Sequence, residues 1–327
     1  MRRSIAIAAV LGILFAAWAL APWKASAGTL STDILGMFPK DVTEFGYADL
    51  KSARQYAWFP QLREQLLPSR FRDFEKFLIS AGVDSSSQVD EIAWAGFPVS
   101  KGGGEDVVGV ALGAFNPTAA EDRFKAQKLA KIDERGFHLY AFGSGTGGGS
   151  ILFTFVDVNT ALFGSRAAIE KMLDVRTGTA ASLLTDDTLF PLISAANGNG
   201  IIWGVLNQKY THEAMQQLLP QAGQFQQATA IMNRVKAMTI VITADKNLDA
   251  KIEAVCGSTD DANLMGAAAQ AGIMVRRYQA SQANPDLATA LDQITVKPSG
   301  DHLKLDIPIT QDQLLSLIHD RTLAMPM

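Results

Sequence analysis

The chain has 327 residues, of which 48% are hydrophobic and 19% are charged, and its formal net charge is −4. This acidic balance argues against binding to nucleic acid or to anionic membrane surfaces, because both repel a negatively charged protein. Its single cysteine, Cys256, excludes an intramolecular disulfide, so we expect packing alone to hold the fold and Cys256 to be a small buried side chain.

Residues 1–27 have the three parts of a secretory signal peptide. Arg2 and Arg3 give a positive start, residues 5–21 are an unbroken apolar run, and residues 25–27 are the small residues Ala-Ser-Ala. We therefore predict cleavage before Gly28, and export from the cytoplasm. The alternative is an uncleaved anchor, because 17 apolar residues are close to the shortest run that spans a bilayer. Any contact with the membrane is expected through this segment alone.

Residues 28–180 are predicted to form a first αβ unit. Its expected elements are a strand at 45–50, a helix ending near Pro68, a helix at 71–81, strands at 89–97 and 107–115, a helix at 118–132, strands at 137–142 and 151–158, and a helix at 167–175. The strands follow from period-two alternation and β-branched residues. Asn116-Pro117 is typical of a helix start, with a capping side chain followed by proline.

Residues 181–327 are predicted to repeat this order. The expected elements are a strand at 201–207, a helix ending near Pro220, a helix at 224–235, strands at 238–244 and 250–256, a helix at 260–278, strands at 294–297 and 303–309, and a helix at 311–320. The first helix of each unit ends in Gln-Leu-Leu-Pro, at 65–68 and at 217–220. The matching order and endings predict an internal duplication.

The predicted fold class is α+β, built from two tandem β-α-α-β-β-α-β-β-α repeats. Neighbouring strands joined by short turns have to be antiparallel. We therefore expect antiparallel sheet covered by helices, with the two units related by a pseudo-twofold axis. Whether the strands form one continuous sheet or two is left open by the sequence.

Motifs for catalysis and metal binding give little support to an enzyme. The chain has no Gly-x-Ser-x-Gly, His-Glu-x-x-His, Ser-x-x-Lys or P-loop sequence. Gly143, Gly145 and Gly148 match dinucleotide-binding spacing, but an apolar strand follows where that motif needs a helix. The four histidines fall in four different elements, without a second ligand at metal spacing. We expect no cofactor and no metal.

The two units differ in the character of their strands. In the second unit polar residues alternate with apolar ones, which predicts one face in water; these polar residues are Thr239, Thr243, Lys251, Glu253, Lys304 and Asp306. The first unit has almost no polar face, so its sheet has to be covered on both sides. The cover is either the protein's own helices or second unit, or an external ligand or partner.

Small residues beside aromatic ones mark the candidate binding site on the first-unit sheet. They leave room for an apolar ligand or a partner element, and Tyr140 supplies a polar group. The candidate binding residues are Ala93, Ala95, Gly109, Ala111, Gly113, Tyr140 and Phe142.

The segment 37–50, with Met-Phe-Pro-Lys-Asp followed by Phe-Gly-Tyr-Ala-Asp-Leu, resembles the opening of exported bacterial proteins of unknown function with a duplicated αβ unit (DUF3352-like). The resemblance covers most of the mature chain and brings no catalytic residues with it. We expect an exported, non-enzymatic binding or scaffolding protein of the bacterial cell envelope, with an envelope protein or an apolar ligand as its partner. The alternatives are a carrier of an apolar ligand and a hydrolase with a noncontiguous site.

Overall fold

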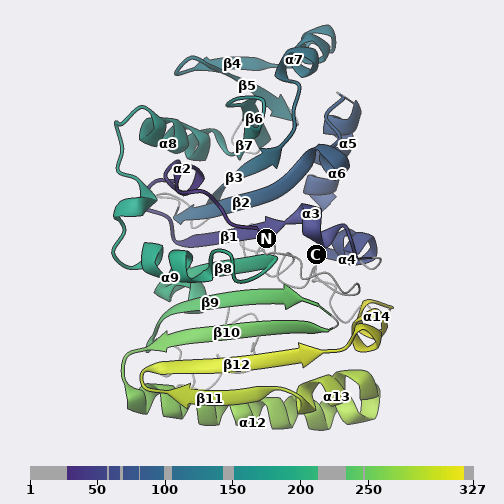
Figure 1. The fold of residues 1–327 in the computed structure, drawn as a ribbon, viewed down its shortest axis with the longest axis vertical. Coiled ribbons are helices and arrows are strands. Elements are labelled where there is room, and N and C mark those ends of the chain that lie inside the picture. Colours follow the sequence, from purple (N-terminus) through teal and green to yellow (C-terminus); the bar gives the residue numbers. More distant parts are fainter. Residues whose placement is uncertain are drawn as a thin grey trace.

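The computed structural model describes residues 28–56, 59–66, 69–80, 82–98, 105–142, 151–212, 233–245 and 247–319. The predicted signal peptide, the glycine-rich loop at 143–149 and the second Gln-Leu-Leu-Pro motif at 217–220 lie outside these residues, and so does part of the first motif. The described residues form an α+β fold with one large antiparallel sheet and helices on both of its faces (Figure 1).

The sheet has twelve strands, and every neighbouring pair is antiparallel. Its order is β11-β12-β10-β9-β8-β1-β2-β3-β7-β6-β5-β4. The strands are β1 (Glu44–Asp49), β2 (Val89–Pro98), β3 (Glu105–Gly113), β4 (Lys131–Glu134), β5 (Phe137–Phe142), β6 (Ile151–Phe155), β7 (Thr160–Gly164), β8 (Ile202–Asn207), β9 (Val235–Ala244), β10 (Leu248–Cys256), β11 (Thr295–Ser299) and β12 (His302–Ile309).

The two halves of the chain meet where β1 pairs with β8, and Gly46 lies opposite Gly204 there. Outward from this pair, one side runs β1-β2-β3-β7-β6 and the other runs β8-β9-β10-β12-β11. The first half then adds β5 and β4 at its edge. The question of one sheet or two is thus answered for the described residues, because the strands of both halves share a single sheet.

Two predicted elements of the first half are wrong. The helix expected at 118–132 is α7 (Pro117–Ala126), and β4 follows it; Lys128, with φ of 54°, ends the helical conformation. The strand expected at 151–158 is β6, then a turn, then β7. Asp157 makes that turn, because its Oδ1 accepts the N–H of Asn159 at 2.8 Å. The first half therefore has four strands after α7, where two were predicted.

Helices cover the two faces of the sheet unequally. One face, called here the α8 face, carries α2 (Thr32–Leu35), α8 (Arg166–Arg176) and α9 (Leu189–Ala196), together with the short 3₁₀ helix η1 (Leu183–Thr185). The other, called the α12 face, carries the remaining described helices: α3 (Leu50–Ala53), α4 (Phe59–Leu66), α5 (Ser69–Ser80), α6 (Ser85–Gln88), α7, α12 (Thr259–Ala283), α13 (Pro285–Asp292) and α14 (Gln311–His319).

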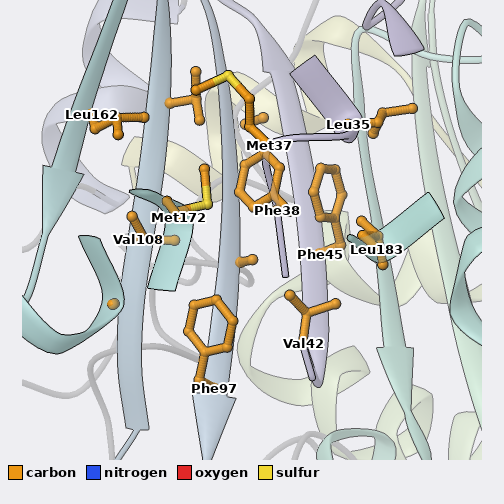
Figure 2. Close-up of a cluster of buried hydrophobic side chains, with 14 of the residues drawn as sticks. Leu35, Met37, Phe38, Val42, Phe45, Phe97, Val108, Leu162, Met172 and Leu183 are labelled. Carbon is orange, nitrogen blue, oxygen red and sulfur yellow. The ribbon is translucent and has the colours of Figure 1, made fainter. Parts of the chain in front are cut away.

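The first half is apolar on both faces of its sheet, as predicted, and both faces are covered. On the α8 face, Phe45 packs edge-on against Phe38, with ring centroids 4.8 Å apart, and Met172 of α8 lies over Val108 of β3 (Figure 2). On the α12 face, an aromatic cluster fills the space under α5 and α7. Its rings include Phe74, Phe77, Phe124, Tyr140, Phe142, Phe153, Phe155 and Phe163.

The second half has the predicted alternation of polar and apolar residues. Ile240, Ala254 and Leu303 are buried on the α12 face, whereas Lys251 and Lys304 are exposed on the α8 face. The helices that follow the last strand of each half explain the difference. After β7 the chain enters α8 on the α8 face, while after β12 it enters α14, which packs into the core of the opposite face.

Candidate functional site

The residues predicted to bind a ligand lie on two different faces of the sheet. Ala93 and Ala95 are 0% exposed on the α8 face, inside the core under α8. Gly109, Ala111 and Gly113 alternate with Val108 and Val110 along β3 and so lie on the α12 face. The seven residues therefore do not form one surface.

The glycines of β3 give room to neighbouring parts of the protein itself. A Cβ on Gly109 would lie 2.1 Å from Cζ of the Phe163 ring, and one on Gly113 would lie 1.8 Å from the carbonyl oxygen of Gln88. Both distances are below any ordinary contact, so these positions accommodate a cross-strand ring and the backbone of a neighbouring segment. The absence of a side chain at each position is explained by this packing.

Tyr140 and Phe142 belong to the aromatic cluster of the α12 face. Phe124 lies 4.8 Å from Tyr140 between ring centroids, and Phe77 lies 5.1 Å from Phe142. Burial, with a smaller contribution from Glu121, raises the pKa of Tyr140 to about 12, which keeps its phenol neutral. The protein's own helices cover these residues, so an apolar ligand could enter only if a helix moved away.

Groups suited to catalysis or metal binding are scattered over the described residues. No group of three or more His, Cys, Asp or Glu side chains is close enough to hold a metal ion in this part of the chain. His138 lies on the surface, 2.6 Å from Asp133, and Cys256 is 0% exposed, as predicted. Burial raises the pKa of the Cys256 thiol, so little of the reactive thiolate forms.

None of the described helices combines the length and the apolar character that crossing a bilayer requires. The longest of them, α12, has 25 residues and packs against β10, β11, β12 and α13 at one end of the molecule (Figure 1). Ser258 starts it, since its hydroxyl oxygen accepts the N–H of Asp261. Ala262, Met265 and Ala280 are buried along the side that packs.

The opposite side of α12 carries an exposed run of apolar residues, called here the α12 stripe. Met274 is 69% exposed, Tyr278 is 74%, Val275 is 56% and Leu264 is 45%. Three exposed alanines fill the positions between them, which makes the stripe continuous over four turns. The stripe consists of Leu264, Ala267, Ala268, Ala271, Met274, Val275 and Tyr278.

The α12 stripe gathers most of the large apolar side chains that the described residues expose. The others are Ile79, Val158 and Leu315, which belong to three different segments. Single exposed apolar residues are ordinary, whereas a continuous patch marks an interaction surface. The stripe repeats at three- and four-residue steps, the pattern by which one helix packs on another.

The amino-acid sequence of α12 contains a periodic signal for this stripe. A helix was expected at 260–278, and its apolar residues follow two stripes, one on each side. Ala262, Met265 and Gly266 lie along the side that packs on the sheet. Only the fold decides which of the two sides packs on the sheet and which remains exposed.

Comparison with known proteins leaves the family open. No protein-family model matches the chain, and no curated protein matches it. A solved structure described as crystal form I of TP0453 is similar to 93% of this chain and to 100% of its own chain, at 13% sequence identity and a TM-score of 0.48. A likeness of this size assigns no function.

Proposed function

We propose that this is an exported, non-enzymatic binding protein of the bacterial cell envelope, and that it docks a helix of another envelope protein on the α12 stripe. The observation that carries the proposal is the exposure of seven apolar residues along one side of α12. Burying four large side chains that are roughly half exposed is worth about 1 kcal/mol each, which offsets part of the free-energy cost of association.

The dimensions and borders of the stripe favour a helix as the occupant. From Leu264 to Tyr278 it is about 21 Å long, which is the length of four helical turns. Its middle is Ala267, Ala268 and Ala271, and small residues let two helix axes approach closely. Uncharged amides form its polar rim, as expected for an interface border. They are Asn263, Gln270, Gln279 and Gln282.

Export is supported by the signal features of residues 1–27 and by the resemblance of the segment 37–50 to exported bacterial proteins. Loss of the three basic residues of the signal changes the formal net charge from −4 to −7. A non-enzymatic role is supported by the separation of these groups: Cys256 is buried beside Leu303 on the α12 face, His302 lies opposite Val255 on the other face, and His138 is on β5 in the first half.

We further infer that the two halves descend from one duplicated αβ unit. The strand order outward from β1 and β8 agrees over five strands on each side. The residue row that starts at Gly46 passes through Trp94, Gly109 and Phe163; the row from Gly204 passes through Ile240, Ile252 and Leu305. The hairpin of β4 and β5 is then an insertion in the first unit.

A photo-crosslinking residue at Val275 of the exported protein tests the docking proposal. We expect an adduct whose crosslinked site maps to an apolar helix of an envelope protein. A Tyr278→Lys change in the same chain should abolish that adduct, because it places a charge in the apolar contact one helical turn from Val275. The matched control is Ile79→Lys, an exposed apolar residue on α5, which should leave the adduct unchanged. Adducts only to lipid, adducts only to a second copy, or no adduct would contradict the proposal.

A further inference from the structure

Gly28, the first residue after the predicted cleavage site, lies against a buried polar cluster. A Cβ atom on Gly28 would lie 2.0 Å from Tyr47 Oη and 3.1 Å from Asp49 Oδ2. The first distance leaves no room for a side chain, which explains glycine at this position. The backbone of residue 28 therefore contacts the Tyr47 hydroxyl and faces the Asp49 carboxylate.

The position of Gly28 is fixed by bonds two residues further along the chain. The N–H of Leu30 donates to Asn197 Oδ1 at 2.9 Å, and the Leu30 carbonyl accepts from Asn197 Nδ2 at 2.9 Å. Leu30 is also buried in the core of the α8 face. The start of the mature chain is thus anchored by contacts with a residue 167 positions away.

The cluster beside Gly28 is acidic. Tyr47 donates to Glu91 Oε2 at 3.1 Å, and Asp49, which is 5% exposed, accepts the N–H and the hydroxyl of Ser52 at 2.8 and 2.6 Å. Hydrogen bonds from neutral donors are the contacts that these two carboxylates make here. Charge compensation is therefore incomplete.

The nearby cationic side chains form ion pairs with a third carboxylate, that of Asp90. Lys51 and Arg54 both form ion pairs with Asp90, and among the described residues neither Asp49 nor Glu91 forms one. Burial raises the pKa of Glu91, with Asp49 and Asp90 adding to the rise, while the Tyr47 hydrogen bond and Lys51 act in the opposite direction. A positive charge placed beside Asp49 and Glu91 would therefore meet no ion pair to compete with among the described residues.

We propose that cleavage of the Ala27–Gly28 bond supplies this charge, and that the new α-ammonium group of Gly28 binds Asp49 beside the Tyr47 hydroxyl, which connects it to Glu91. The inference rests on the proposed export and processing. Hydrolysis by a signal peptidase consumes one water molecule and replaces the amide by a carboxylate on Ala27 and an amine on Gly28. That amine is protonated near neutral pH.

The geometry allows this contact only in the processed chain. The N–Cα bond, about 1.46 Å, is nearly as long as a Cα–Cβ bond. Rotation about the Cα–C bond of a terminal glycine turns the ammonium toward the side on which Asp49 Oδ2 lies, and a small shift of the Tyr47 hydroxyl brings the nitrogen to hydrogen-bonding distance from it. In the precursor the same nitrogen is an uncharged amide joined to Ala27. Its N–H groups then face the Asp49 carboxylate and the oxygen of Tyr47, and the Tyr47 hydroxyl connects this site to Glu91.

The test compares two purified chains, one beginning at Gly28 and one beginning at Ser26, each released from a tag without extra residues. Carboxylates stabilise the charged amine, so the pKa of the Gly28 amino group should rise above its ordinary value. At neutral pH its acetylation should be at least about fivefold slower than that of the Ser26 chain. The Gly28 chain should also melt about 2–4 °C higher.

Glu91→Gln keeps an acceptor for Tyr47 but removes a charge, so it should shrink both differences between the two chains. Asp49→Asn should do the same, although it also weakens the cap of α3. The comparison of the two unmutated chains does not depend on this variant. Equal acetylation rates and equal melting temperatures of the two chains would contradict the proposed binding of the Gly28 ammonium group. Sequencing of native protein that begins elsewhere than at Gly28 would instead overturn the processing, whatever the purified chains show.

Discussion

The third and fourth strands outward from the centre carry opposite residue types in the two halves. On the α8 face, Val110 of β3 pairs with Leu162 of β7, and both are 0% exposed. At the matching positions Glu253 of β10 pairs with Lys304 of β12, and their side chains form an ion pair at 3.3 Å. The same strand arrangement therefore supports a buried apolar pair and a solvent-exposed charged pair.

The difference shows that the helix after the last strand determines which residues a face needs. α8 covers the first pair, so a charge there would lose its water. α14 packs on the opposite face of the sheet, and Glu253 and Lys304 keep their contact with solvent. Side-chain polarity follows the cover, since the backbone pairing is the same in both halves.

The largest expected effect comes from exchanging these residue types. Val110→Glu should lower the free energy of unfolding by at least about 3 kcal/mol, or prevent folding, because it buries an unpaired carboxylate under α8. Its counterpart Glu253→Val should change the free energy by less than about 1 kcal/mol. Urea unfolding followed by circular dichroism measures both. Similar losses in the two variants would end the distinction between the covered and open faces.

A cavity in the cover itself should have the next largest effect. Ile169 of α8 is 0% exposed, and Ile169→Ala should cost about 2–5 kcal/mol through lost burial and an unfilled space. Leu315 of α14 is 37% exposed, so Leu315→Ala should cost less than about 1 kcal/mol. Thermal and urea unfolding of both variants test whether α8 is a structural cover. A cost near zero for Ile169→Ala would show that it is not.

Added volume in the first half should have an intermediate effect. Gly109→Ala directs a methyl group at the Phe163 ring, and overpacking of this kind costs about 1–3 kcal/mol. The matching position in the second half is Ile252 opposite Leu305, which already holds a branched side chain. Ile252→Val should therefore cost no more than about 1.5 kcal/mol. A stabilised Gly109→Ala protein would mean that the ring over β3 is free to move aside.

The smallest effect is expected from the ion pair on the open face. A double-mutant cycle with Glu253→Ala and Lys304→Ala should give a coupling of about 0.2–1 kcal/mol, since both side chains are about half exposed. The coupling should fall as salt is added, because exposed charges are screened. A coupling energy above about 2 kcal/mol that does not change with salt concentration would show that this face is covered.

Much of the sheet could be predicted from local pattern. The alternation of Lys251 and Glu253 with Ile252 indicated that one face of the second-half sheet is exposed to solvent. The helix predicted at 311–320 agrees with α14 within a residue. The turn at Asp157 was missed, because the apolar residues on both sides of it read as one strand. β4 was missed because its four residues are too few to interrupt a helical pattern.

The candidate sites were less predictable, because they depend on contacts between distant segments. Small residues such as Gly109 indicate space in a sequence, yet the Phe163 ring from another strand fills that space. The α12 stripe has a periodic signal, but the packed side of α12 has a similar one. Gly28 meets Tyr47 and Asp49 only through the tertiary fold, so no local pattern could reveal that contact.

The docking role of the α12 stripe is tested most directly by placing the same photo-crosslinking residue at two surfaces of the exported protein. One position is Val275 on the stripe, and the other is Lys304, which is exposed on the opposite face of the sheet. The account predicts a protein adduct from position 275 and none from position 304. An adduct from position 304 in the absence of one from position 275 would contradict it and would make the open sheet face the binding surface.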